Sequence, residues 1–208
     1  MTPDLLGWLA SAVFLSRLVP QPARLLRTGV PDGVSPMSAM NCIVTDLGWI
    51  AYGLLAGLVP VWVVGIVSLF PGVLFVVLLL RRTTLRDLLG SAIWTGVIIA
   101  AWAIGALGAV LAISVVVNNG PQVWVAVRER NLVGLAPTTW LIAIADALLW
   151  GAYGVATGDG ALIGYGVVLL VSALVILGRI RLTRDTAHGS PDSPISAGAS
   201  AQVAGDSG

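Results

Sequence analysis

The sequence predicts an all-α membrane protein with seven transmembrane helices, arranged as two parallel three-helix repeats joined by a linker helix. Three observations predict this fold. The composition is strongly apolar, a long segment of the first half recurs in the second half, and seven stretches approach the length of a membrane span.

The composition places the chain in a lipid bilayer. Hydrophobic residues make up 57% of the 208 residues and charged residues 10%, and the mean hydropathy is +0.95. A soluble domain has about 45–50% apolar and about 25% charged residues. The net charge of +1 argues against a nucleic-acid partner, because proteins that bind nucleic acids usually carry a strongly basic surface.

An internal repeat sets the architecture. Residues 20–82 match residues 121–183 without a gap, at a constant offset of 101. The matched positions are Pro20-Gln21 with Pro121-Gln122, Gly33 and Pro36 with Gly134 and Pro137, Trp49-x-x-Tyr52-Gly53 with Trp150-x-x-Tyr153-Gly154, and Gly57 and Gly65 with Gly158 and Gly166. Many transporters consist of two such halves and bind their substrate where the halves meet.

Seven segments approach the roughly 20 apolar residues that cross a hydrocarbon core of about 30 Å. We expect spans at 5–25, 36–55, 60–80, 88–107, 109–127, 137–155 and 161–177. After three spans the chain lies on the opposite side of the membrane from its start. A fourth span, the linker helix, returns it to the starting side, so that the second triplet runs parallel to the first. The predicted parts are a first repeat at 1–82, a linker helix at 83–107, a second repeat at 108–184 and a disordered cytoplasmic tail at 185–208, rich in Ser, Gly and Ala.

The arginines predict the orientation. Apart from Arg17, they lie at or beyond the ends of the first, third, fifth and seventh spans, and none follows the second, fourth or sixth. Cytoplasmic loops retain an excess of basic residues. We therefore expect an integral protein of the plasma membrane, with its N-terminus outside and its C-terminus in the cytoplasm.

The sequence gives little material for an enzyme. All eleven basic residues are arginines, Cys42 is the single cysteine, and the single histidine, His188, lies in the predicted tail. A disulfide within the chain, a His/Cys metal cluster and a Cys-His nucleophile pair are therefore excluded. We expect no catalytic residue, no metal and no cofactor.

A Pro-Gln pair lies at matched depth in the first helix of each repeat. Pro20 and Pro121 each remove a backbone donor and clash with the preceding turn, so each is expected to kink its helix. Two kinks related by the repeat can act as hinges for alternating access, with Gln21 and Gln122 satisfying the freed carbonyls. The alternative is a pair of static kinks that improve packing.

Three ionisable residues fall inside predicted spans: Arg17, Asp46 and Asp146. Such residues are costly in a membrane and usually face a cavity or a partner. We consider three interpretations: Asp46 and Arg17 form a structural ion pair, one aspartate binds a proton during transport, or one aspartate binds a substrate hydroxyl or amino group. Asp146 has no obvious basic partner in the sequence and is the better candidate for substrate or proton.

Asn118 occupies the position in the second repeat that Arg17 occupies in the first. Its amide either caps the broken helix before Pro121 or lines the transport pathway. Because the two repeats present different chemistry at one depth, the pattern favours a single oriented substrate over a symmetric pore.

These motifs together resemble the PQ-loop superfamily, in particular the SWEET sugar transporters. The resemblance rests on Pro-Gln in the first helix of each triplet, on the turns Gly33-Val34-Ser35-Pro36 and Gly134-Leu135-Ala136-Pro137, and on Trp-x-x-Tyr-Gly near the end of the second helix. It covers nearly all of residues 5–184. It implies a seven-helix transporter that moves mono- or disaccharides by energy-independent uniport, often as a homo-oligomer.

The resemblance also implies site residues. The family's midplane tryptophan matches Trp49 and Trp150, whose indoles would form a floor for the apolar face of a pyranose; the alternative is packing and interface anchoring. The family's sugar-holding asparagine lies thirteen residues after the motif tyrosine, where this chain has Gly65 and Gly166. Two glycines would instead widen the cavity or let helices approach closely.

Three functions follow from these residues. The first is a SWEET-like facilitator that holds a small polar solute, such as a sugar, near Trp49, Trp150 and Asp146. The second is a proton-coupled transporter of amino acids or other small solutes, as in another branch of the superfamily. The third is a membrane receptor or assembly protein that has kept the fold and lost the pathway.

Overall fold

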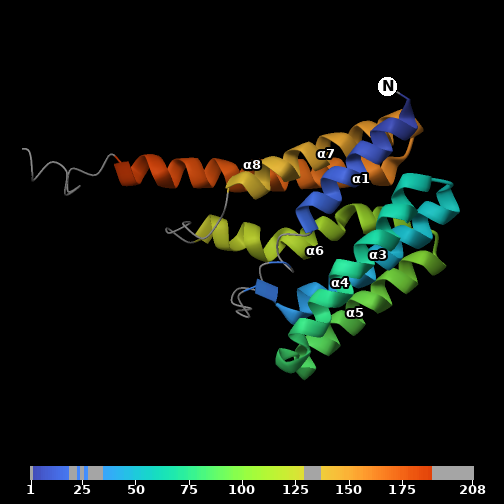
Figure 1. Cartoon of the computed structure of the whole chain (residues 1–208), viewed down its shortest axis with the longest axis horizontal. Helices are drawn as coiled ribbons and strands as arrows, with labels where there is room; N and C mark the ends of the chain where they lie inside the picture. Colours follow the sequence, from blue (N-terminus) through green and yellow to red (C-terminus); the bar gives the residue numbers. More distant parts are fainter. Residues whose placement is uncertain (1, 19–22, 24–25, 28–34, 129–136, 189–208) are drawn as a thin grey trace, which may run out of the picture.

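The computed structural model describes residues 2–18, 23, 26–27, 35–128 and 137–188, with the side chains of 118–128, 137–138 and 182–188 left outside the description. This part of the chain is helical and contains no strand. The elements are α1 (Pro3–Leu18), α3 (Pro36–Ala56), α4 (Val59–Leu79), the 3-10 turn η1 (Leu80–Arg82), α5 (Leu85–Ala103), α6 (Leu107–Arg128), α7 (Pro137–Thr157) and α8 (Gly160–His188) (Figure 1). Each predicted span falls mainly on a different helix, which confirms the predicted fold class.

Several helix ends differ from the prediction; α5, for example, ends at Ala103 instead of 107. Two of the differences have a clear local cause. α5 begins three residues early because Thr84 and Asp87 form a capping box, in which each side chain bonds the other's backbone N–H. α8 continues to His188, well past the predicted end at 177 and into the first residues of the predicted tail. Apolar runs set the predicted ends, whereas Arg, Leu and Ala after the span still favour a helix. The rest of the tail lies outside the described residues.

Matching turns end the second helix of both triplets. Gly57 and Gly158 each have φ of 70°, a left-handed conformation that glycine adopts at low cost and that commonly terminates helices. At the start of α3, the Ser35 hydroxyl accepts a hydrogen bond from the Ser38 N–H, and Pro36 occupies the first turn. The repeat in sequence thus produces repeated helix boundaries.

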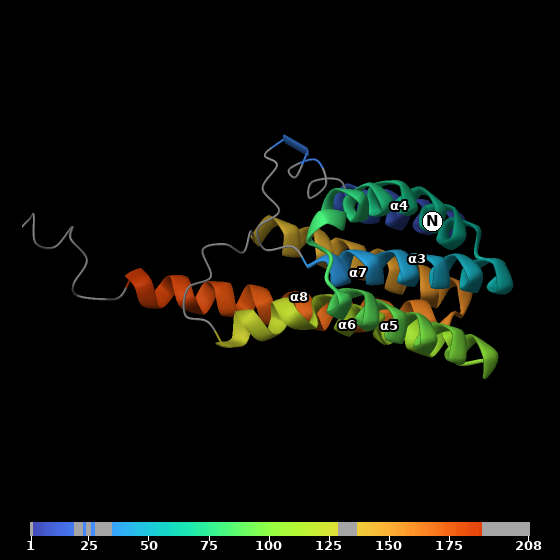
Figure 2. The same ribbon diagram turned by 90° about the horizontal axis from the view of Figure 1, so that it is seen from below.

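The third helix of each triplet packs between the other two. α4 contacts both α1 and α3, and α8 contacts both α6 and α7. Between the triplets, α1 packs against α7 and α3 packs against α6, while the linker α5 packs against α3 and α6 (Figures 1 and 2). The first helix of each triplet therefore contacts the second helix of the other.

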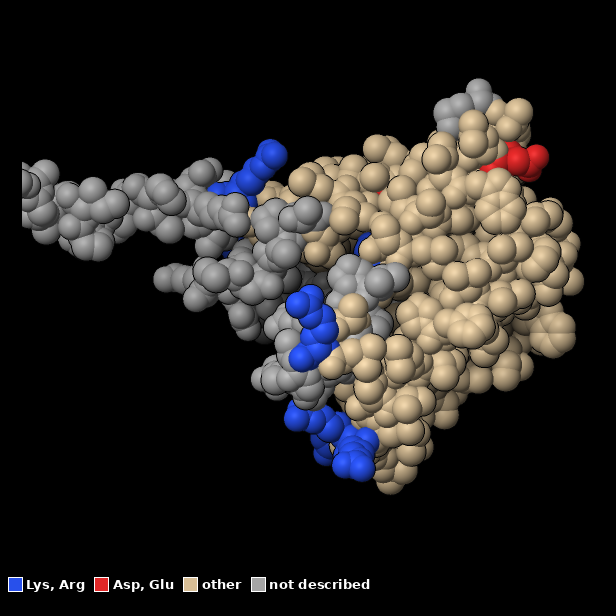
Figure 3. Space-filling model, viewed as in Figure 1, with Lys and Arg blue, Asp and Glu red and all other residues tan. Residues whose placement is uncertain are grey.

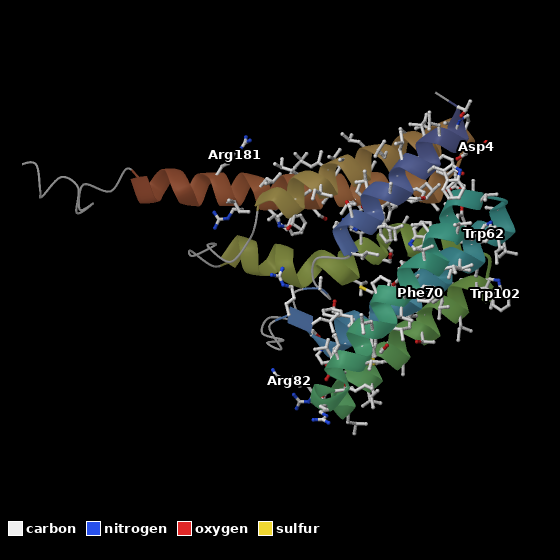
Figure 4. The ribbon with its side chains drawn as sticks, in the orientation of Figure 1. Asp4, Trp62, Phe70, Arg82, Trp102 and Arg181 are labelled. Atoms are coloured by element: carbon white, nitrogen blue, oxygen red, sulfur yellow. The ribbon has the colours of Figure 1, made fainter. Side chains whose placement is uncertain are left out.

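The outer surface is that of an integral membrane protein. Among the described residues, five helices are long and apolar enough to cross a membrane, and large apolar side chains face outward, such as Phe70 at 77% exposure. Charged side chains gather at the ends of the molecule (Figure 3). Arg82 and Arg181 mark one end, called here the arginine end, and Asp4, Trp62 and Trp102 mark the opposite Asp4 end (Figure 4).

Candidate functional site

A cavity of about 40 Å³ lies between the two triplets. Its walls come from α1, α3 and α4 of the first triplet and from α7 and α8 of the second. The lining residues are Phe14, Asp46, Trp49, Val61, Val64, Gly65, Trp150, Leu162 and Tyr165. Asp46 and Trp49 stand near the middle of α3, so the cavity lies at mid-depth in the membrane.

Both tryptophans of the repeated motif line this cavity. Trp150 is buried, and the Trp49 ring packs edge-on against Tyr165 with 5.7 Å between centroids. Each tryptophan also packs edge-on against the tyrosine of its own motif, Tyr52 or Tyr153. The structure thus places the two tryptophans together between the triplets. Their role in substrate binding remains a prediction.

Arg17 of α1 forms an ion pair with Asp146 of α7, with 3.3 Å between Nη2 and Oδ2. Asp146 is fully buried, and the Arg17 side chain is 21% exposed. The Tyr165 hydroxyl on α8 accepts a hydrogen bond from Arg17 at 3.5 Å and donates one to Asp146 Oδ2 at 3.3 Å. One polar cluster therefore joins three helices from both triplets.

Of the three interpretations, the structure does not form the Asp46–Arg17 ion pair, and it gives Asp146 the basic partner that the sequence did not make obvious. The reason is the packing order. α4 lies between α1 and α3 and separates Arg17 from Asp46, whereas α1 packs directly on α7. A buried carboxylate requires a partner, and Arg17 is the cation that this packing presents to Asp146.

Asp146 does not itself line the cavity, but its partner Tyr165 does. Its Oδ1 atom is buried and accepts no hydrogen bond from the described residues, although the Trp150 indole lies one helical turn away. An unsatisfied buried acceptor is costly. In this conformation Asp146 reaches the cavity only through Tyr165. Its role in binding substrate or proton remains a prediction.

Asp46 lines the cavity directly. Its Oδ2 atom accepts a hydrogen bond from the Ser68 hydroxyl on α4 at 2.7 Å. Among the described residues no cationic side chain forms an ion pair with Asp46. Asp46 is thus the carboxylate of the cavity wall whose charge the neighbouring side chains leave uncompensated.

The linker helix makes the two repeats unequal. The repeat equivalent of Asp146 is Thr45, whose hydroxyl accepts a hydrogen bond from the Trp94 indole of α5 at 3.0 Å. α5 therefore occupies the partner position of Thr45, while α1 supplies Arg17 to Asp146. This difference places the ionic cluster on one side of the pseudo-symmetric molecule.

The two glycines that replace the family's asparagines have different surroundings. Gly65 lines the cavity, and a Cβ atom there would lie 2.6 Å from the Ile50 side chain. A Cβ atom on Gly166 would lie 2.7 Å from the Ala147 carbonyl oxygen and 2.9 Å from the Gly151 Cα. Gly65 therefore lets the Ile50 side chain pack against α4 at the edge of the cavity, and Gly166 lets α8 approach the backbone of α7.

A second contact joins the triplets at the Asp4 end. The Tyr52 hydroxyl of α3 donates a hydrogen bond to Asp159 Oδ2 at 2.6 Å, and Asp159 Oδ1 accepts one from the Leu162 N–H at the start of α8. Our sequence analysis missed this pair. The available signal was an acidic residue in the turn after the second motif, where the first repeat has Leu58.

The hinge candidates lie partly outside the described structure. Pro20 and Gln21 are outside the described residues. α6 runs as one helix from Leu107 to Arg128, but the side chains of Asn118, Pro121 and Gln122 are not described. The hinges and the pathway role of Asn118 therefore remain predictions.

The architecture defines a seven-helix membrane protein built from two triplets and a linker. More particularly, the chain has the fold of a SWEET transporter. It superimposes on a eukaryotic SWEET transporter solved at 3.7 Å resolution, with a TM-score of 0.68 over 88% of this chain and 97% of that one, at 12% sequence identity. No protein-family model matches the sequence. No curated protein matches it either. The predicted likeness in fold is confirmed.

Proposed function

We propose that the protein is a transmembrane transporter of small polar solutes that works by alternating access. The observation that carries this proposal is the cavity between the triplets, with Trp49 and Trp150 in its walls. Transporters built from repeats bind substrate at mid-depth where the repeats meet. The likeness in fold makes a SWEET-like sugar facilitator the first candidate, on grounds of analogy.

The proposed orientation places the arginine end in the cytoplasm, since basic residues are retained on that side. The Asp4 end then faces the outside of the cell, and the C-terminal end of α8 lies in the cytoplasm. Trp62 and Trp102 mark the outer membrane interface, where tryptophan is enriched. The plasma membrane is the location that we propose.

In this orientation the conformation is closed to the outside. The Tyr52–Asp159 hydrogen bond joins the triplets at the Asp4 end, and the helices α3, α4 and α5 diverge from α7 and α8 towards the arginine end (Figure 1). Opening to the outside requires this bond to break and the triplets to rock. The Pro20-Gln21 and Pro121-Gln122 pairs are the proposed hinges.

A sugar substrate requires the cavity to widen during transport. A volume of about 40 Å³ accommodates about three water-sized groups, and a sugar ring with its hydroxyls is larger. For a sugar, the conformation is therefore a contracted state, and rocking of the triplets would enlarge the space between Trp49 and Trp150.

A second candidate function is proton-coupled transport of an amino acid or another small solute. The observation that favours it is Asp46, an uncompensated carboxylate in the cavity wall. A carboxylate at this depth is suited to bind a proton on one side of the membrane and to release it on the other.

The test is solute uptake by purified protein in liposomes, with labelled glucose, sucrose and a panel of amino acids, with and without an imposed proton gradient. Sugar uptake that ignores the gradient supports the facilitator. Amino-acid uptake that requires the gradient supports the second candidate. If correctly folded protein moves no solute beyond the rate of empty liposomes, the transporter proposal is overturned in favour of a receptor or assembly role.

A further inference from the structure

We infer that the solute held in this cavity is a small organic cation with an ammonium group, and that Asp46 is its counter-ion. The inference rests on the proposed transport function and narrows its substrate class. Three features of the cavity carry it: its polar groups, its balance of charge and its aromatic walls.

Few of the lining residues carry a polar group. They are Asp46, Trp49, Trp150 and Tyr165, and the Tyr165 hydroxyl is already bonded to Arg17 and Asp146. The remaining lining residues are aliphatic side chains, Phe14 and Gly65. A sugar carries many hydroxyls, and each needs a placed donor or acceptor once buried. The wall does not provide that number.

The balance of charge is negative. Arg17, the cation nearest the cluster, is paired with Asp146, and neither is a lining residue. Ser68 donates one hydrogen bond to Asp46 Oδ2, which leaves Oδ1 without a partner among the described residues. A charge removed from water requires a charged or hydrogen-bonded partner. A bound cation supplies that partner to Asp46.

Aromatic rings form much of the remaining wall. Phe14, Trp49, Trp150 and Tyr165 line the cavity, and the Trp49 and Tyr165 rings are held at 86° to each other. Aromatic rings attract cations through the negative charge of their faces, and clusters of such rings recognise ammonium ligands. A carboxylate within an aromatic enclosure therefore favours an ammonium group over a neutral solute of the same shape.

The size of the cavity agrees with a small head group. About 40 Å³ holds about three water-sized groups, which suits an ammonium nitrogen with its first substituents.

The test is equilibrium binding of labelled choline and methylammonium to the purified full-length protein, followed by competition. The neutral competitor is 3,3-dimethylbutan-1-ol, which has the shape of choline with carbon in place of the charged nitrogen. We expect it to compete at least about tenfold more weakly than choline. Equal competition by the two would overturn the inference, and this comparison needs no variant protein.

Variants locate the site. Asp46→Asn keeps an acceptor for Ser68 and removes the charge, so choline should bind at least about tenfold more weakly. The matched control is Asp87→Asn, which neutralises an exposed carboxylate in the cap of α5 and should bind as the wild type does. Unchanged choline binding by a folded Asp46→Asn protein would overturn the inference.

Measurements of solute uptake into liposomes test the transport function separately from the cation site. Choline binding without choline uptake into liposomes would keep the cation site and contradict transport. Uptake of glucose by a protein that does not bind choline or methylammonium would support transport and overturn the cation site.

Discussion

Arg17 and Asp146 form an ion pair across the junction of the two triplets, with 3.3 Å between Nη2 and Oδ2. The pair joins α1 of the first triplet to α7 of the second, and Tyr165 of α8 bonds to both partners. Because buried ion pairs add little net stability but are costly to break, this cluster is suited to fix the register between the triplets.

Removing one partner of this pair should destabilise the protein. Arg17→Met leaves Asp146 charged and buried, at a cost of about 3 kcal/mol in the free energy of unfolding. The double variant Arg17→Met with Asp146→Leu should recover most of this loss, because no unpaired charge remains. Unfolding in detergent would measure both effects. Additive losses in the double variant would show that the pair does not interact as described.

The Tyr165 hydroxyl should contribute separately from its ring. Tyr165→Phe keeps the edge-on contact with Trp49 and removes both hydrogen bonds to the cluster, so it should cost about 1–2 kcal/mol. The matched control is Tyr153→Phe, since Tyr153 makes no hydrogen bond through its hydroxyl among the described residues. Equal stability of the two variants in thermal unfolding would contradict the assigned role of Tyr165.

The two equivalent glycines should respond differently to substitution. Gly166→Ala places a methyl group against the backbone of α7, which cannot retreat, and should cost about 3 kcal/mol. Gly65→Ala meets the Ile50 side chain, which can move, and should cost about 1 kcal/mol. The yield of folded protein and its unfolding temperature report both costs. A larger loss of stability in Gly65→Ala than in Gly166→Ala would contradict the environments assigned to the two glycines.

The contact at the Asp4 end should control access from outside. Tyr52→Phe removes the hydrogen bond to Asp159, so the outward-open state should gain population roughly tenfold. The measurement is the rate at which a membrane-impermeant thiol reagent labels a Val64→Cys protein from outside, in a Cys42→Ala background. Tyr153→Phe is again the control. Labelling that does not rise in Tyr52→Phe would argue against a gate at this position.

Much of the fold follows from local properties of the sequence. Apolar runs of span length, Gly57 and Gly158 at matching turns, and the constant offset between repeats all act within or between neighbouring helices. These features predicted seven helices in a SWEET-like arrangement, and the comparison of structures confirms the fold.

The pairing of charges depended on packing that the sequence does not display. Depth along a helix placed Arg17, Asp46 and Asp146 in the membrane, but depth does not reveal which helices touch. α4 separates Arg17 from Asp46, and α1 contacts α7. The Tyr52–Asp159 contact was missed for the same reason, because its partners are 107 residues apart.

The glycines show a similar limit. A missing side chain can permit contact with a neighbouring side chain or with a neighbouring backbone, and the sequence is the same in both cases. Gly65 lies against the Ile50 side chain at the cavity, and Gly166 lies against Gly151 of α7. The environment, which the tertiary packing determines, distinguishes the two roles.

The most direct test of transport by alternating access is to lock the Asp4 end and measure flux. Cysteines replace Tyr52 and Asp159 in a Cys42→Ala background, and a short, reducible bifunctional thiol reagent joins them in liposomes. With any solute that the reduced protein carries, we predict that uptake falls to the rate of empty liposomes after cross-linking and recovers after reduction. Uptake that continues at the full rate through the cross-linked protein would contradict the account.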